Sequence, residues 1–332
     1  MGRETGGWSQ ILETPWKTDR MNLPNAPNHP AARRNDTHGT GIHMGTNLPE
    51  RTEHYRHLKL VYSGQSSQLW KARDERDGKT AAVKRLLAET VDRQHAGMLK
   101  KEIQVLSALG DSKYFVHIYE TGKDGKIPYV AMEWFPAPSV GELVKLGYEV
   151  YAPVLPILIP LMFEPLVPFH EAGWIHRDIK PDNFLFAPDM GIKLIDFAIA
   201  IRKGEGAFAR LLVKPSQTQG TATYMPPEQI ENKTVTERSD LYSLGCTILE
   251  LLTDAAPFSG NTLQELLKKH ISGNVPSAAA KNRNVTPQFD AFLKTLMSPR
   301  PEDRPSSARE ALAVLKRTPI FFRTPQSGDK LP

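Results

Sequence analysis

Cysteine is almost absent from this chain, since Cys246 is its one cysteine in 332 residues. An intrachain disulfide is therefore excluded, and the composition suits a reducing compartment. We expect a cytoplasmic protein. Cys246 lies within the apolar stretch 244–252, which favours a buried structural thiol over a nucleophile.

Long runs of positive charge are also missing, because no stretch contains five consecutive lysine or arginine residues. The formal net charge is +5. An ordinary solvated surface with a mild basic excess accounts for this value better than a nucleic-acid interface does. We therefore expect no nucleic-acid partner.

Uninterrupted apolar runs of membrane-spanning length are missing as well. The most apolar stretch, from Val150 to Phe163, is broken by Pro153, Pro156 and Pro160. It is shorter than the about 20 apolar residues that a spanning helix needs. The N-terminus lacks the charged start and apolar core of a secretory signal. We expect no membrane insertion.

The chain divides into a polar start, a patterned centre and a short end. Residues 1–53 are rich in proline, asparagine, glycine, threonine and histidine and have no hydrophobic period, which predicts a disordered N-terminal tail. The patterned domain covers 54–318, and 319–332 is a C-terminal tail. Strands surround one helix in 55–135, whereas 139–317 is mostly helical. The pattern predicts an α+β fold with a small antiparallel sheet lobe and a larger helical lobe.

The expected elements follow from hydrophobic periodicity and from turn residues between the periodic segments. Strands are expected within 55–72, 80–86, 115–121 and 129–134, and helices at 90–109, 237–252, 263–271, 288–297 and 306–316. The last helix begins with Ser307 and Glu310 at the spacing of a capping box.

The most informative motifs lie near the middle of the chain. Residues 176–183 read His-Arg-Asp-Ile-Lys-Pro-Asp-Asn, and Asp-Phe-Ala follows at 196–198. They closely resemble the catalytic loop and the metal-binding loop of protein kinases. Lys180 followed by Pro181 resembles serine/threonine rather than tyrosine kinases. The run at 301–308 resembles soluble bacterial members, so the chain is identified as similar to Hanks-type kinases.

This resemblance implies a bilobal kinase fold and specific roles for the motif residues. Asp178 would orient the attacking hydroxyl, Lys180 would steady the transferred phosphate, and Asn183 and Asp196 would hold Mg²⁺ or Mn²⁺. The implied reaction is transfer of the ATP γ-phosphate to Ser or Thr of protein substrates, with autophosphorylation expected. The resemblance names no individual substrate and no oligomeric state.

The same resemblance assigns nucleotide-binding roles in the small lobe. Lys84 ends the run Ala-Ala-Val-Lys and would contact the α- and β-phosphates, with Glu102 on the next helix as its partner. The phosphate-covering loop falls at 62–69, where Gly64 is the only glycine kept of the three in the family motif. We therefore expect a phosphate-covering loop with altered ATP affinity.

Residues 132–135, which follow the fifth strand, match the hinge that binds adenine in kinases. Backbone groups of Glu133 and Phe135 would form the hydrogen bonds to adenine. Met132 would guard the back of the pocket. The histidine of the catalytic loop, His176, is read as a buried structural residue rather than an acid or base.

The activation segment is expected at 197–225. Arg177 would pair with a phosphate on this segment, because an arginine before the catalytic aspartate has that role in the family. Candidate phosphorylation sites are Ser216, Thr218 and Thr223. Thr221 would form hydrogen bonds near the catalytic loop, which is a further mark of serine/threonine kinases.

Three further charged residues are expected to support the larger lobe. Glu228 should pair with Arg304, since a buried charge in a helical lobe needs a partner. Asp240 matches the aspartate that holds the backbone of the catalytic loop from the following helix.

Some features depart from the family pattern and leave alternatives open. Ala198 replaces the glycine of Asp-Phe-Gly, and we expect it to restrict flipping of the metal-binding loop. Together with the degraded glycine loop, it argues for the alternative of a pseudokinase that acts as a nucleotide-binding scaffold. The retained residues that carry the chemistry argue against this alternative more strongly; they are Lys84, Glu102, Asp178, Asn183 and Asp196. A small-molecule kinase is a third reading. The expected helix at 150–171 contains five prolines, so it is either broken into kinked turns or docks on a partner or membrane.

Overall fold

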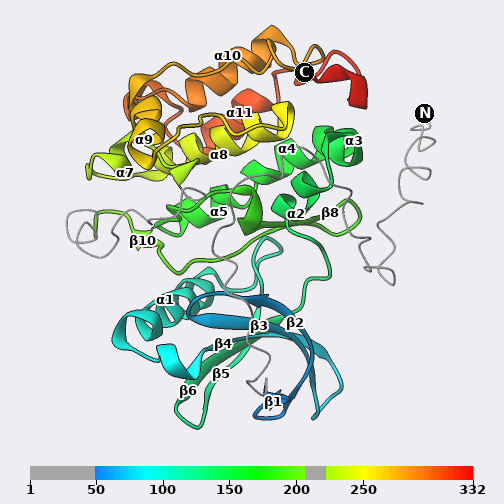
Figure 1. Cartoon of the computed structure of the whole chain (residues 1–332), viewed down its shortest axis with the longest axis vertical. Coiled ribbons are helices and arrows are strands. Elements are labelled where there is room, and N and C mark those ends of the chain that lie inside the picture. The colour runs from blue at the N-terminus through cyan, green and yellow to red at the C-terminus, as the bar shows by residue number, and fades with distance from the viewer. Residues whose placement is uncertain (1–48, 206–221, 332) are drawn as a thin grey trace.

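The computed structural model describes residues 49–205 and 222–331. Figure 1 shows these residues as two lobes, one containing the main sheet with one long helix and the other mostly helical. The small lobe ends at the hinge, residues 132–135, from which the chain passes into α2 (Val140–Lys145) of the larger lobe. The α+β, two-lobed fold predicted from the sequence is confirmed.

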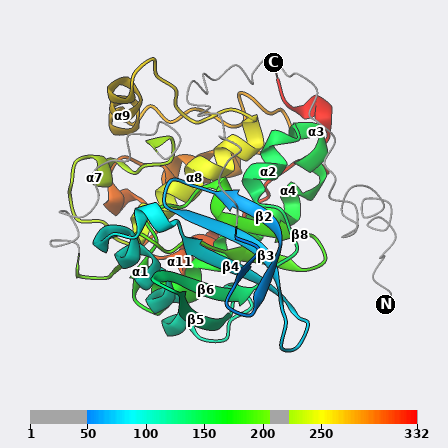
Figure 2. The same cartoon turned by 60° about the horizontal axis from the view of Figure 1, so that its bottom comes forward.

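The main sheet is antiparallel and has the strand order β1-β2-β3-β4-β6-β5. Its strands are β1 (Arg51–Thr52), β2 (Tyr55–Ser63), β3 (Ser67–Asp74), β4 (Thr80–Leu86), β5 (Ile118–Asp124) and β6 (Ile127–Glu133). Apolar side chains alternate along β3, where Trp70 and Ala72 are buried on one face. Figure 2 shows this sheet beside α1, with the helical lobe behind it.

The long helix of the small lobe, α1 (Arg93–Leu109), begins after the N-cap Asp92, whose side chain accepts the His95 N–H. This cap explains why the helix starts three residues later than predicted, since a short 3₁₀ turn, η3 (Ala88–Thr90), comes first. Leu99, Glu102, Val105 and Leu106 are its buried residues. The buried face therefore contains one carboxylate among aliphatic side chains.

In its described residues, the larger lobe consists of helices and four short strands. Its further helices are α3 (Tyr148–Tyr151), α4 (Leu155–Phe163), α5 (Leu166–Glu171), α7 (Pro227–Ile230), α8 (Glu237–Thr253), α9 (Leu263–Ser272), α10 (Pro287–Leu296) and α11 (Ala308–Leu315). Its strands are β7 (Trp174–Ile175), β8 (Phe184–Ala187), β9 (Gly191–Leu194) and β10 (Ile201–Arg202). The four long helices predicted for this lobe are present within two residues at each end.

The proline-rich segment before the catalytic loop is broken into short consecutive helices, as one of the two predicted readings has it. Pro156 lies in the first turn of α4 and Pro165 at the N-cap of α5. Backbone N–H groups at these positions have no partner inside the helix, so a proline there loses no hydrogen bond. Pro160 alone lies inside α4. Buried Leu158, Ile159 and neighbouring side chains pack this segment into the core.

By length and composition alone, the segment Tyr148–Glu171 could cross a membrane, with 24 residues and a mean hydropathy of 1.8. In the structure, 56% of its most apolar window is buried inside the protein. A core helix of a globular lobe has this same composition, so the burial accounts for the apolar residues without a membrane.

The described part of the predicted N-terminal tail is not disordered. β1 pairs with β2 through Arg51 opposite Arg56 and Thr52 opposite Tyr55. Thr52 is buried, and its hydroxyl lies 3.0 Å from Nε2 of His57. The prediction is therefore wrong for 49–53, because strand pairing and the His57 ring fix a segment that has no hydrophobic period of its own.

The segment after α11 also packs against the large lobe. Asp329 is buried and pairs with Arg323. Lys330 reaches Asp254 at the end of α8, with Nζ 2.7 Å from Oδ2. Isolated strand bridges join this segment to the loop before α10. These contacts extend the folded part beyond residue 318.

One buried histidine makes the stability of this lobe dependent on pH. His270 is 1% exposed, its Nδ1 lies 2.9 Å from the Tyr242 hydroxyl, and burial lowers its pKa to about 4 from 6.5. The folded state therefore binds a proton less readily than the unfolded state. The stability that the neutral ring contributes is present above pH 6.5 and is lost as the pH falls toward 4.

We expect His270 to account for a loss of about 2 kcal/mol in the free energy of unfolding by pH 5. Denaturant unfolding of wild type and His270→Gln at pH 7.5 and pH 5 measures this loss. The wild type should lose more stability than the variant over this interval. Equal losses would contradict the assignment.

Candidate active site

Lys84, the lysine predicted to contact the nucleotide phosphates, lies in β4 and forms an ion pair with Glu102 of α1. Lys84 Nζ donates to Glu102 Oε2 of α1 at 2.6 Å. Both residues are largely buried, with side-chain exposures of 22% and 6%. Burial alone would lower the pKa of Lys84, but the charges of Glu102 and Asp196 outweigh it and raise that pKa. The structure therefore contains the lysine–glutamate pair that the sequence predicts, with a charged ammonium.

The catalytic loop holds the side chain of Asp178 from two sides. Lys180 Nζ donates to its Oδ2 at 2.7 Å, and Asn183 Nδ2 donates to the same oxygen at 3.1 Å. Asn183 Nδ2 also lies 2.7 Å from the Asp178 backbone carbonyl. The 3₁₀ turn η5 (Pro181–Asn183) brings Asn183 back to this position. One oxygen of the Asp178 carboxylate is thus oriented by two donors.

Asp196 follows β9 and has a backbone φ of 64°. Burial opposes its ionisation, but the positive charges of Lys84 and Lys180 outweigh the burial and lower its pKa. Its Oδ1 accepts the Ala198 N–H at 3.4 Å. The structure therefore brings an ionised carboxylate close to both lysines of the site.

The oxygen donors at this position fit a divalent cation that is shared with a nucleotide. Asn183 directs its amide nitrogen toward Asp178, which leaves the amide oxygen for a ligand, and Asp196 supplies a carboxylate. No group of three His, Cys, Asp or Glu side chains in the described residues could hold a metal alone. Mg²⁺ is commonly held by one or two protein oxygens together with substrate phosphates, so this donor set suits it.

The backbone of the catalytic loop is fixed by Asp240 of α8. Its two carboxylate oxygens accept the N–H groups of His176 and Arg177, each at 2.8 Å. A third partner, His170 Nε2 of α5, lies 2.9 Å away and was not predicted. Burial alone would raise the pKa of Asp240, but His170 and His176 lower it. His176 itself is fully buried, as the structural reading of this histidine expects.

Arg177 has a positive φ of 71°, which costs energy in a residue with a Cβ and is offset by the Asp240 hydrogen bond. Its guanidinium is mostly enclosed, and its Nε has no hydrogen-bond partner among the described residues. Burial lowers the pKa of this guanidinium, with Asp240 acting in the opposite direction. Among the described residues, the group is therefore a poorly compensated cation.

Lys193, which was not predicted as a site residue from the sequence, contacts the hinge residue Glu133. Lys193 of β9 is buried, and its Nζ lies 2.9 Å from Glu133 Oε2 and 2.8 Å from the Phe115 carbonyl. The signal was a lysine in an otherwise apolar strand. The backbone N–H of Glu133 donates to the His117 carbonyl at 2.8 Å. Only the backbone carbonyl of Glu133 is therefore left to bind adenine. Met132 is buried behind this strand end.

The expected phosphate-covering loop is the turn between β2 and β3. Gly64 N–H donates to the Ser67 carbonyl at 2.9 Å, which closes the turn. The carbonyl of Ser66 accepts the Leu87 N–H and the Thr90 hydroxyl, both at 2.9 Å. The hairpin tip is therefore attached to the segment that follows β4.

Most of the predicted regulatory positions lie outside the described residues. This applies to Ser216, Thr218 and Thr221. Thr223 is described and is 9% exposed. Its hydroxyl would have to become more exposed before a second kinase molecule could modify it.

The predicted ion pair between Glu228 and Arg304 is present and buried. Two parallel hydrogen bonds join the groups, with Nη1 to Oε1 at 2.7 Å and Nη2 to Oε2 at 2.9 Å. Ser239 Oγ donates to Glu228 Oε1 at 2.6 Å. The guanidinium also stacks over the Tyr242 ring, 4.8 Å from its centroid. The pair ties α7 to α8 and to the loop before α11.

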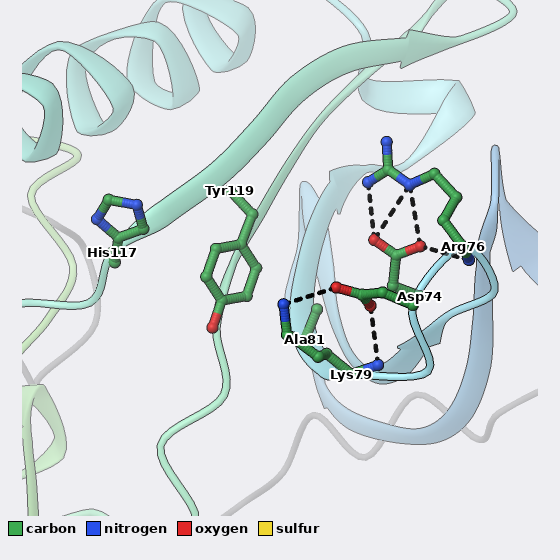
Figure 3. Close-up of a pocket in the computed structure, with 7 residues that line it drawn as sticks. Asp74, Arg76, Lys79, Ala81, His117 and Tyr119 are labelled. Carbon is green, nitrogen blue, oxygen red and sulfur yellow. Dashed lines mark hydrogen bonds and ion pairs between the residues drawn. The ribbon is translucent and has the colours of Figure 1, made fainter.

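A separate cleft of about 250 Å³ lies on the outer side of the small lobe (Figure 3). Its lining residues are Asp74, Arg76, Asp77, Lys79, Ala81, His117 and Tyr119. Arg76 pairs with Asp74 at 2.7 Å and Lys79 with Asp77 at 2.8 Å, so the charges compensate each other. None of the predicted catalytic residues lines this cleft.

Comparisons with known proteins agree with the resemblance to protein kinases that the sequence motifs show. The family model described as protein kinase domain matches residues 55–315. The chain is 31% identical over 250 residues to serine/threonine-protein kinase PknL of Mycobacterium bovis, covering 75% of this chain and 61% of that protein. It is 33% identical over 269 residues to probable serine/threonine-protein kinase PknB of Corynebacterium glutamicum, covering 78% and 41%.

The chain is also 30% identical over 272 residues to serine/threonine-protein kinase PknB of Mycolicibacterium smegmatis, covering 80% of this chain and 43% of that protein. The chain thus spans less than two thirds of the length of these relatives. Because the matched region contains both lobes and every described site residue, this chain belongs to the protein kinase family.

Proposed function

We propose that this chain is an active serine/threonine kinase that transfers the γ-phosphoryl group of ATP to protein hydroxyls. The observation that carries the proposal is the formed constellation, in which Asp178 is oriented by Lys180 and Asn183 while Lys84 pairs with Glu102. A scaffold that only binds nucleotide would use Lys84 and Glu102 but would not need an oriented Asp178. Relatives named as serine/threonine kinases also favour the active reading over the scaffold.

The carboxylate of Asp178 would accept the hydrogen bond of the attacking Ser or Thr hydroxyl and aim its oxygen at the γ-phosphate. Lys180 already donates to Oδ2 of Asp178, so its ammonium lies where it can also contact a phosphate oxygen. Lys84 would hold the α- and β-phosphates while Glu102 fixes its position. The reaction then depends mainly on positioning and on electrostatic stabilisation.

Asn183 and Asp196 would hold Mg²⁺ or Mn²⁺ through their side-chain oxygens. The cation, when bound, would neutralise negative charge on the phosphates. The lowered pKa of Asp196 keeps its carboxylate ionised near neutral pH, which is the state that a divalent cation needs.

Regulation by phosphorylation is part of the proposal. The enclosed Arg177 guanidinium, whose Nε lacks a partner in the described residues, is suited to a phosphate on Ser216 or Thr218, with Thr223 as a further candidate. Thr221 would instead form hydrogen bonds near the catalytic loop. The substrates would be proteins, and the single buried thiol Cys246 is compatible with a cytoplasmic site of action.

Incubation with labelled ATP and Mg²⁺, followed by mass spectrometry, tests the function. We expect label on serine or threonine in wild type and none in Lys84→Met, which should lose the phosphate contact. ATP binding without transfer to the protein itself or to generic protein acceptors would favour the scaffold reading. Transfer to a small molecule alone would favour the third reading.

A further inference from the structure

The residue at the first glycine position of the phosphate-covering loop is Tyr62, and the sheet register determines where it points. Tyr62 lies opposite Leu69, and Leu69 lies opposite Lys84. Directly opposed residues of antiparallel strands direct their side chains to the same face of the sheet. The Tyr62 phenol is therefore on the face that carries the Lys84 ammonium.

The ring of Tyr62 lies over the tip of the hairpin. A Cβ at Gly64 would be 2.7 Å from the Tyr62 hydroxyl oxygen and 2.8 Å from Cε1. Gly64 is thus needed for close contact with this ring, and no larger residue fits there without movement of the phenol. Tyr62 nevertheless remains 60% exposed, so its hydroxyl is open to a ligand.

Side chains replace two of the three glycines of the family motif on this loop, which restricts how closely its backbone can approach a phosphate. The Gly64 N–H is used by Ser67 inside the turn, and the motif keeps one glycine of three. The described residues provide no hydrogen-bond acceptor for the Tyr62 hydroxyl, and the sheet register places its ring on the Lys84 face. A side-chain donor therefore stands where backbone amides would otherwise approach a phosphate.

We propose that the Tyr62 hydroxyl donates a hydrogen bond to a β- or γ-phosphate oxygen of bound ATP and so compensates for the restricted approach of the loop backbone. This inference rests on the proposed function, because it assumes that ATP binds between the hairpin and Lys84. The hairpin is held for this contact by the bonds from Leu87 and Thr90 to Ser66. Tyr62 is then a nucleotide-binding residue specific to this chain's loop.

Equilibrium binding of adenosine, AMP, ADP and ATP with Mg²⁺ to the full chain tests the proposal. Tyr62→Phe removes only the hydroxyl and should weaken binding of ATP about tenfold, the usual effect of losing a hydrogen bond to a charged group. Adenosine binding should be unchanged, and the first nucleotide affected in the series identifies the phosphate. Tyr119→Phe, an exposed tyrosine in the outer cleft, is the matched control and should match wild type throughout.

Three outcomes would overturn the inference, and they can be told apart. Equal ATP binding by wild type and Tyr62→Phe would show that the hydroxyl makes no phosphate contact. An equal loss for adenosine and ATP would assign the ring to the nucleoside or to loop structure. No ATP binding by wild type would contradict the proposed function itself. Melting temperatures without nucleotide should agree between variant and wild type.

Discussion

Asp178→Asn should lower kcat by about two to four orders of magnitude, the usual contribution of a positioned acid–base group. Asparagine keeps the size of the side chain and can still accept the Lys180 hydrogen bond, but it cannot take a proton from the substrate hydroxyl. Steady-state phosphorylation of a generic protein acceptor measures kcat. ATP affinity should stay within a few-fold of wild type, because the role proposed for Asp178 is to contact the substrate hydroxyl and not adenine.

The control for this experiment is Asp189→Asn, which changes an exposed aspartate in the turn between β8 and β9. It should leave kcat within a few-fold of wild type. If Asp178→Asn retains near-normal turnover, the assigned base is wrong. If it instead abolishes ATP binding, the loss is structural and the role of Asp178 in the chemical step is unsupported.

Glu228→Ala should lower the free energy of unfolding by about 3–5 kcal/mol, because it leaves a buried guanidinium without its counter-charge. Arg304 has a side-chain exposure of 0% and Glu228 of 3%. The remaining acceptors of Arg304, the carbonyls of Ser298, Pro299 and Arg238, satisfy hydrogen bonds but not the charge. Denaturant unfolding at neutral pH measures the change.

Two further variants separate charge burial from general damage. Glu171→Ala breaks the ion pair between Glu171 and Arg309, whose side chains are 53% and 70% exposed, respectively. This variant should change the free energy of unfolding very little. The double variant Glu228→Leu with Arg304→Met removes both charges and should recover part of the lost stability. If the double variant is no more stable than Glu228→Ala, packing rather than the unpaired charge explains the loss.

Local motifs were sufficient to predict the residues that act close together in sequence. Asp178, Lys180 and Asn183 lie within one short loop, so their spacing alone places them near one another. The larger separations between Lys84 and Glu102 and between Glu228 and Arg304 were predicted only because their order along the chain resembles a family. The types of the helices and strands followed from hydrophobic periodicity. Their observed ends differ from the predicted ends by a few residues, because capping residues such as Asp92 determine where a helix begins.

Other features had no signal of this kind. His170 and Lys193 belong to no motif, and only the folded chain brings them to Asp240 and Glu133. The segment 49–53 has no pattern of its own and becomes a strand by pairing with β2. The sequence left open how the segment 150–171 accommodates five prolines. In the structure this segment is divided into short helices, and prolines at helix starts lose no backbone hydrogen bond.

The sequence by itself determined the family and the two-lobed α+β fold and predicted the residues proposed for catalysis, because contiguous motifs and hydrophobic periods are local properties. Only the tertiary structure decided which buried charges are paired, how the hinge is held and which face of the sheet Tyr62 shares with Lys84. The physical reason is that strand register and helix packing bring together residues far apart in the chain, and a single sequence does not encode those contacts as a local pattern.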